Sequence, residues 1–181
     1  MTTPFIDDQG RPEPPFDADE VGSVLGFLDY QRATLEWKTR GLNEVGLSTT
    51  TAKSTMTLGG ILKHMSWVED HWFSHVLHGR DRAEPWRSID WKAFPDWEWT
   101  SALDDSAGDL RNMWASACTA SRTAVEEALN HGGLDQPAVR ALGGGDHPSL
   151  RWIVLHMIEE YARHNGHADL LREAVDGEVG E

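Results

Sequence analysis

The histidines of this 181-residue chain are concentrated in two segments, because seven of the nine lie within residues 64–78 and 156–167. In the second segment, His156, Glu160 and His164 follow one another at intervals of four residues. This spacing places the three side chains in one row along a helix, and apolar neighbours indicate that the row borders the apolar face. A carboxylate and imidazoles close to a core are costly unless they are paired or bind a cation.

Two imidazoles and one carboxylate can bind a divalent cation and leave a coordination position open for water or substrate. Glu160 and His164 would supply two of the ligands, and the third is expected from another helix. His64 is the best candidate for it, because Leu62 and Met65 flank it. Several first-row metals accept such ligands, so the identity of the ion stays open. The alternative is that His64, Glu160 and His164 are polar residues on helix flanks or hydrogen-bonded core residues, and spacing alone favours the two readings about equally.

Three further polar residues are candidates for supporting roles. His71 lies two turns after His64 on a similar face, Glu69 lies between them, and His167 follows His164. Glu69, His71 and His167 could each orient a metal ligand through a hydrogen bond or act as a general base.

Other kinds of site are disfavoured by the motifs that the sequence lacks. It has no H-E-x-x-H pattern, no pair of Glu-x-x-His motifs typical of a di-iron bundle and no glycine-rich nucleotide fingerprint. The single cysteine, Cys118, cannot form an intramolecular disulfide or a cysteine-based metal cluster. We interpret Cys118 as a small buried residue rather than a catalyst.

The charge of the chain also narrows the choice of function. With 16 Lys and Arg against 30 Asp and Glu, the formal net charge is −14, which disfavours binding to nucleic acid or to an anionic membrane. No apolar run approaches the roughly 20 residues that span a bilayer. No signal peptide is visible at the N-terminus. We therefore expect a cytoplasmic protein that binds neither nucleic acid nor membrane.

The elements that must position these residues are four amphipathic helices. Apolar residues recur at helical spacing over residues 17–41, 57–79, 106–132 and 149–175, and Thr57 and Ser149 are good N-caps for the second and fourth of these helices. The cap of the first helix is expected at Asp17, because Glu20 follows three residues later as in a capping box.

The segments between these helices differ in character. Residues 1–16 are rich in proline and are expected to form an extended arm, and residues 42–56 are expected to form a polar loop. Residues 80–104 show no periodicity but carry four of the nine tryptophans, which argues against disorder. We expect this tryptophan-rich crossover to cover the core, and lining a substrate site is the alternative. The prediction is an all-α four-helix bundle, with residues 17–181 as a single domain and the crossover between the second and third helices.

Two stretches carry a resemblance to a known family. The segment LKHMSWVEDHW at residues 62–72 and the segment at residues 156–171 resemble the second-helix and C-terminal histidine motifs of the DinB-like metalloprotein superfamily. More specifically, the chain resembles the actinobacterial branch of mycothiol transferases, and the likeness extends over nearly the whole chain. The resemblance implies a four-helix bundle in which three side chains bind a divalent metal, often zinc or nickel.

The resemblance also implies a ligand set, which is His64, Glu160 and His164. The commonest pattern in the superfamily has a His-x-x-x-His pair on the last helix, and Glu160 replaces the first member of that pair here. This departure is similar to the mycothiol-dependent maleylpyruvate isomerases, which use His, Glu and His. His156 then stays outside the set, and His167 stands where many relatives have glutamine, so it is expected beside the ligands or in the pocket.

The function implied by the resemblance is that of a thiol S-transferase. A low-molecular-weight thiol, mycothiol, would coordinate the open metal position, lose its proton and attack an electrophilic small molecule. Such an enzyme needs no nucleophilic cysteine of its own. Two alternatives stay open: a hydrolase that uses a metal-activated water on the same scaffold, and a non-enzymatic small-molecule or stress-response binding bundle. A homodimer is compatible with each of them.

Overall fold

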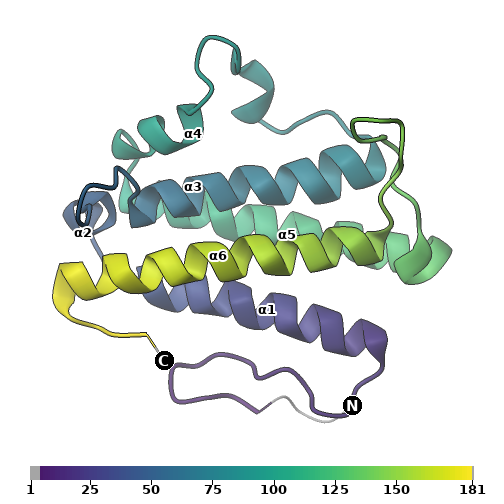
Figure 1. The fold of residues 1–181 in the computed structure, drawn as a ribbon, viewed down its shortest axis with the longest axis horizontal. Coiled ribbons are helices and arrows are strands. Elements are labelled where there is room, and N and C mark those ends of the chain that lie inside the picture. Colours follow the sequence, from purple (N-terminus) through teal and green to yellow (C-terminus); the bar gives the residue numbers. More distant parts are fainter. Residues whose placement is uncertain (1–4, 181) are drawn as a thin grey trace.

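A computed structural model describes residues 5–180 and shows an all-helical chain with no strand in that range (Figure 1). Its long helices are α1 (Glu20–Thr39), α3 (Leu58–Glu69), α5 (Ala107–Gly132) and α6 (Leu150–Asp176). Helix α3 continues without a break into a π-helix, Asp70–Leu77. The predicted all-α bundle is thus confirmed.

Side-chain caps determine where the long helices begin. The side chains of Thr57, Ser106 and Ser149 each accept a hydrogen bond from a backbone N–H three residues later, as expected of helix N-caps. The expectation for the first helix was wrong by two residues, because Asp19 rather than Asp17 accepts from the backbone of Gly22. Both residues are aspartates, so residue type alone does not distinguish them.

Two other local features differ from expectation. The polar loop at residues 42–56 contains a short helix, α2 (Glu44–Ser48), which is too short to show a period in the sequence. The second predicted helix has wide π turns after residue 69 instead of continuing as an α-helix. The apolar residues Phe73, Val76 and Leu77 are buried there, and their spacing also fits an α-helix, so the sequence did not reveal the wider turns.

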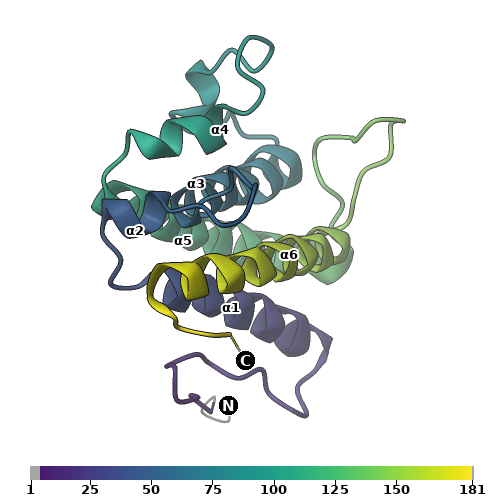
Figure 2. The ribbon, with the colours of Figure 1, turned by 60° about the vertical axis from the view of Figure 1, so that its left-hand side comes forward.

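The tryptophan-rich crossover, residues 80–104, lies over α3 on the side away from α1 (Figure 1, Figure 2). It contains single helical turns at Trp86–Ser88 and Ser101–Leu103, with α4 (Trp97–Thr100) between them. A Cβ added to Gly60 of α3 would lie 3.0 Å from Cε3 of Trp99. Glycine at this position therefore permits the close approach of α4 to α3.

The N-terminal segment lies against α1. Residues 1–4 of the predicted arm lie outside the described residues. Beyond them, the Arg11 guanidinium is placed 4.6 Å from the ring centre of Tyr30 and 4.9 Å from that of Trp37. These cation–π contacts hold the segment on the helix.

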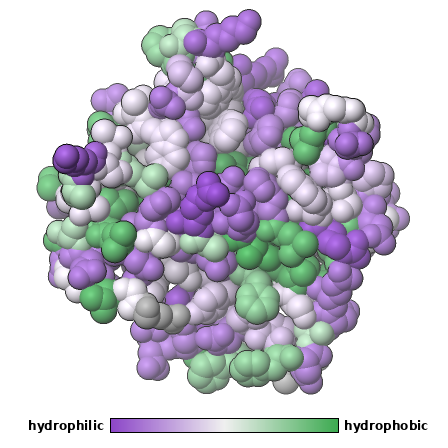
Figure 3. Space-filling view, in the orientation of Figure 1, coloured by the Kyte–Doolittle hydropathy of each residue, from purple (hydrophilic) through white to green (hydrophobic). Residues whose placement is uncertain are grey.

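The outer surface shows where polar and apolar side chains gather. The face that α6 crosses carries hydrophilic residues over its middle and hydrophobic residues beside them (Figure 3). None of the helices in the described part of the chain is long and apolar enough to cross a bilayer.

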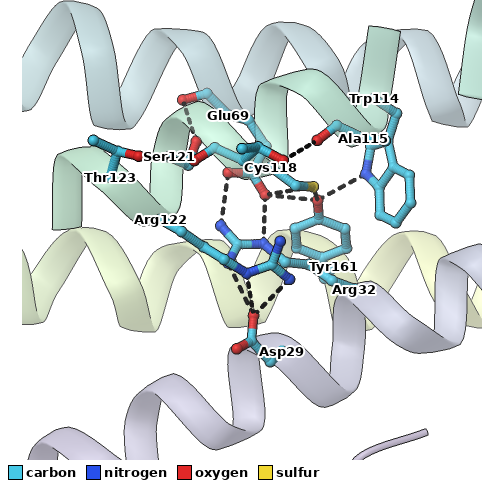
Figure 4. Close-up of polar contacts among 11 residues, drawn as sticks. Asp29, Arg32, Glu69, Trp114, Ala115, Cys118, Ser121, Arg122, Thr123 and Tyr161 are labelled. Atoms are coloured by element: carbon cyan, nitrogen blue, oxygen red, sulfur yellow. Dashed lines mark hydrogen bonds and ion pairs between the residues drawn. The ribbon is translucent and has the colours of Figure 1, made fainter. Parts of the chain in front are cut away.

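A buried ion pair lies at the centre of the bundle (Figure 4). Arg32 of α1 donates from Nε and Nη2 to the two carboxylate oxygens of Glu69 of α3, both at 2.8 Å. Tyr161 of α6 donates its hydroxyl to Glu69 Oε1 at 2.7 Å, and Trp114 of α5 donates to that hydroxyl at 3.0 Å. Burial by itself would raise the pKa of Glu69, but the charge and hydrogen bonds of Arg32 lower it below the ordinary value. Each of the four long helices thus contributes one residue to this hydrogen-bonded cluster.

Cys118 of α5 belongs to the same cluster. Its thiol lies 3.6 Å from Glu69 Oε1 and 3.5 Å from the Tyr161 hydroxyl. Burial, together with the negative charge of Glu69, raises the pKa of Cys118 to about 12. As predicted, Cys118 is a buried residue, and its thiol stays protonated.

We expect the substitution Arg32→Met to lower the free energy of unfolding by about 3–5 kcal/mol, because it leaves Glu69 buried without its counter-charge. Chemical denaturation followed by circular dichroism measures the loss. Adding Glu69→Gln to this variant should recover part of it, since the uncompensated charge is then removed.

The matched control is Arg122→Met, which removes an arginine from an exposed pair with Asp29. Exposed pairs contribute about 0–1 kcal/mol, so the control should change the stability little. Equal losses in Arg32→Met and Arg122→Met would contradict the central role of the buried pair.

Candidate metal centre

The three residues expected as metal ligands lie together between α3 and α6. His64 comes from α3, and Glu160 and His164 come from successive turns of α6. One potential ligand atom from each residue lies within 4.8 Å of the other two. The His64 and His164 ring centres are 4.9 Å apart, and His164 Nε2 is 3.7 Å from Glu160 Oε2. This donor set fits a divalent cation.

The protonation state of His164 suits metal binding. Its pKa is lowered to about 4, mainly by burial and in addition by the neighbouring His64 and His167. At neutral pH the imidazole therefore carries no charge and keeps the lone pair that a metal ligand needs. Its Nδ1 is buried and has no hydrogen-bond partner among residues 5–180. A buried polar atom without a partner is uncommon in proteins and points to a missing ligand.

The crossover supplies a residue that the sequence did not single out, Glu98 of α4. Its Oε1 lies 3.3 Å from His64 Nδ1, which leaves His64 Nε2 available as the ligand atom. The neighbouring Trp99 stacks on the His64 ring at 4.4 Å and lies 5.7 Å from the His164 ring. The crossover thus borders the candidate site as well as covering the core. In the sequence, the only signal was a carboxylate between two tryptophans.

His156 approaches the oxygen of the Glu160 carboxylate that does not face His164. Its Nε2 lies 3.4 Å from Glu160 Oε1, and its Nδ1 lies 3.5 Å from Glu159 Oε2. The ring stacks on Trp152 at 5.0 Å. His156, Glu159 and Glu160 form a second group whose potential ligand atoms lie within 4.8 Å of one another. The structure therefore places His156 next to the candidate ligands without including it in their group.

The three expected supporting residues have different surroundings. The carboxylate of Glu69 faces Arg32 in the core, away from His64 and His164. His71 stacks on Trp67 at 5.2 Å, and its Nδ1 accepts a hydrogen bond from Arg82 at 2.9 Å. The remaining residue, His167, has its ring 5.6 Å from that of His164, and its Nδ1 is buried without a hydrogen-bond partner in the described part of the chain. Of the three, His167 is the one placed beside a candidate ligand.

The stability of the metal-free protein should fall as the pH drops from about 6.5 to about 4. Burial and, to a smaller extent, the positive charge of Arg82 together lower the pKa of His71 to about 4. Below pH 6.5 the unfolded state takes up a proton that the folded state does not, so the folded state loses relative stability. His164 contributes in the same direction.

The test compares wild type and His71→Gln by denaturation between pH 4.5 and 7.5 in the presence of a chelator. In the variant, unfolding should take up about one proton fewer than in wild type. The free energy of unfolding should therefore change with pH by about 1.4 kcal/mol per pH unit less. Identical slopes in the two proteins would contradict the neutral, buried state of His71.

Comparison with known proteins identifies the family. A family model described as mycothiol-S-transferase matches residues 23–177, a range that includes all three candidate ligands and the crossover. No curated protein matches the chain. The match agrees with the mycothiol transferase branch that the resemblance indicated. The chain belongs to the mycothiol S-transferase family.

Proposed function

We propose that this protein is a divalent-metal-dependent thiol S-transferase that joins mycothiol to an electrophilic small molecule. In this proposal His64, Glu160 and His164 hold the ion. The observation that carries it is the convergence of these three donors from α3 and α6 within 4.8 Å. Membership of the mycothiol S-transferase family supports the choice of thiol.

Zinc is the ion that we propose, since two imidazoles and a carboxylate suit it, and the same donors suit nickel. A divalent cation held there would supply the positive charge that favours the thiolate form of a thiol near it. The imidazole of His164 is neutral and Glu160 carries a single negative charge. A divalent ion bound by them would therefore keep a net positive charge. Three protein donors also leave room for a further molecule.

The sulfur nucleophile comes from the imported thiol and not from the protein. Cys118 is buried in the core cluster, and its pKa of about 12 keeps it protonated. Thiols react as thiolates, so Cys118 is unsuited to the reaction both by place and by charge.

His167 is the residue that we propose as proton acceptor, since it lies beside His164. The thiol proton would pass to His167 first, and the resulting thiolate sulfur would then form the bond to the electrophilic carbon as the leaving group departs with its bonding electron pair. Glu69 has no part in this proposal, because Arg32 occupies both of its carboxylate oxygens. His71 has none either, because its Nδ1 already accepts from Arg82.

Metal content tests the first part of the proposal. The purified wild type should contain about one divalent ion per chain by elemental analysis, and a chelator should lower its melting temperature. His164→Ala should lose the ion, because two protein donors hold it far more weakly than three. His131→Ala is the control, since this residue lies on α5 and contacts the backbone of Glu127. A wild type without metal, whose melting temperature is unchanged by chelator, would overturn the metal-dependent function.

Thiol dependence tests the second part. Wild type should form a thioether between mycothiol and members of an electrophile panel, detected by mass spectrometry, and His167→Ala should react more slowly. Cys118→Ala should stay active, because the protein thiol takes no part in the reaction. Hydrolysis of ester substrates at the same rate with and without mycothiol would favour the metal-dependent hydrolase instead.

A further inference from the structure

We propose that Glu98, on the tryptophan-rich crossover, is a positioning residue that fixes the tautomer and orientation of His64. This inference rests on the proposed function, because it gives His64 the role of metal ligand. It goes beyond that function by making the crossover part of the metal centre.

The first argument is the isolation of the Glu98 carboxylate. The residue is 5 % exposed, and its hydrogen-bond partner among residues 5–180 is His64 alone. Its second oxygen, Oε2, is buried with no partner in the same range. A buried carboxylate that lacks a cationic partner is costly. The contact with the His64 imidazole is therefore the interaction that explains why a carboxylate is buried here.

The second argument is the way in which the crossover docks on α3. Three consecutive residues of α4 each contact a different residue of one turn of α3. The contacts are Trp97 with the Lys63 ammonium at 4.3 Å from the ring centre, Glu98 with His64 at 3.3 Å, and Trp99 with the surface left open at Gly60.

These flanking contacts limit the freedom of the carboxylate. Trp99 also stacks on the His64 ring with an angle of 22° between the planes, so the imidazole is held both by its face and by its Nδ1 edge. These contacts oppose rotation of the Glu98 and His64 side chains while α4 stays docked.

The chemical consequence follows from the two nitrogens of imidazole. A carboxylate at Nδ1 favours the tautomer that carries its proton there, and this tautomer leaves the lone pair on Nε2. Carboxylates that accept such a hydrogen bond orient the ligand and raise its basicity, and their removal costs about 10–100-fold in metal affinity. Without Glu98, the His64 ring could take up the other tautomer, whose Nε2 donates a proton and cannot bind an ion.

The test measures Zn²⁺ affinity by competition with a chromophoric chelator in wild type, Glu98→Ala and Glu98→Gln. We expect Glu98→Ala to bind Zn²⁺ about 10–100-fold more weakly. Glu98→Gln should lose less, because its amide oxygen can still accept from Nδ1, and it keeps the shape of the side chain if Glu98→Ala fails to fold. The matched control is Glu159→Gln, which removes a negative charge next to Glu160 without touching a proposed ligand.

A second measurement separates this inference from the metal function. The ¹⁵N shifts of the His64 ring in the metal-free protein at pH 8 report which nitrogen carries the proton. Wild type and Glu98→Gln should carry it on Nδ1, and Glu98→Ala should carry it on Nε2, a change that a merely structural role would not produce. If the wild type binds no Zn²⁺, the proposed function fails, and the tautomer comparison still decides the role of Glu98. An unchanged tautomer in Glu98→Ala, or Zn²⁺ affinities of both Glu98 variants within threefold of Glu159→Gln, would overturn the inference.

Discussion

The buried contact between Arg32 and Glu69 sets the rotation of the helices on which the candidate site depends. Since Glu69 must face Arg32, α3 can adopt one rotation about its axis, and His64, five residues earlier, then faces α6. Tyr161 does the same for α6, because its hydroxyl donates to Glu69 and the preceding residue, Glu160, is thereby turned toward His64. The core cluster around Glu69 thus orients the helices that carry the candidate metal centre.

The two clusters differ in how completely their polar atoms are paired. In the core, Arg32 and Tyr161 together satisfy the Glu69 carboxylate, so the charge is compensated within the protein. At the candidate metal centre, His164 and Glu98 each keep a buried polar atom without a partner in the described range. Buried polar atoms without a partner are uncommon in proteins, so the second cluster, unlike the first, has polar atoms free to meet a further group.

The crossover brings to the candidate site a carboxylate, Glu98, that the four long helices do not supply. A carboxylate on a long irregular segment is brought to His64 by two flanking tryptophans, which contact α3 through Lys63 and the open surface at Gly60. Aromatic rings bury a large apolar area, so they can hold a single helical turn in place without regular secondary structure around it. That docking gives a role to Trp97 and Trp99, which are two of the four tryptophans of this segment.

Much of the fold was determined by the sequence alone, because helices are built from local repeats. The apolar period and the caps at Thr57 and Ser149 predicted the long helices, and the spacing of Glu160 and His164 placed both on one helical face. The partners of Glu69 and His64 were decided only by the tertiary structure. Arg32 and Glu98 are 37 and 34 residues away from them along the chain, and no local period encodes a contact at that distance. From the sequence, His64 was the best candidate for the third ligand and Glu69 was a candidate supporting residue, and the rotation of α3 placed Glu69 in the core and His64 beside α6.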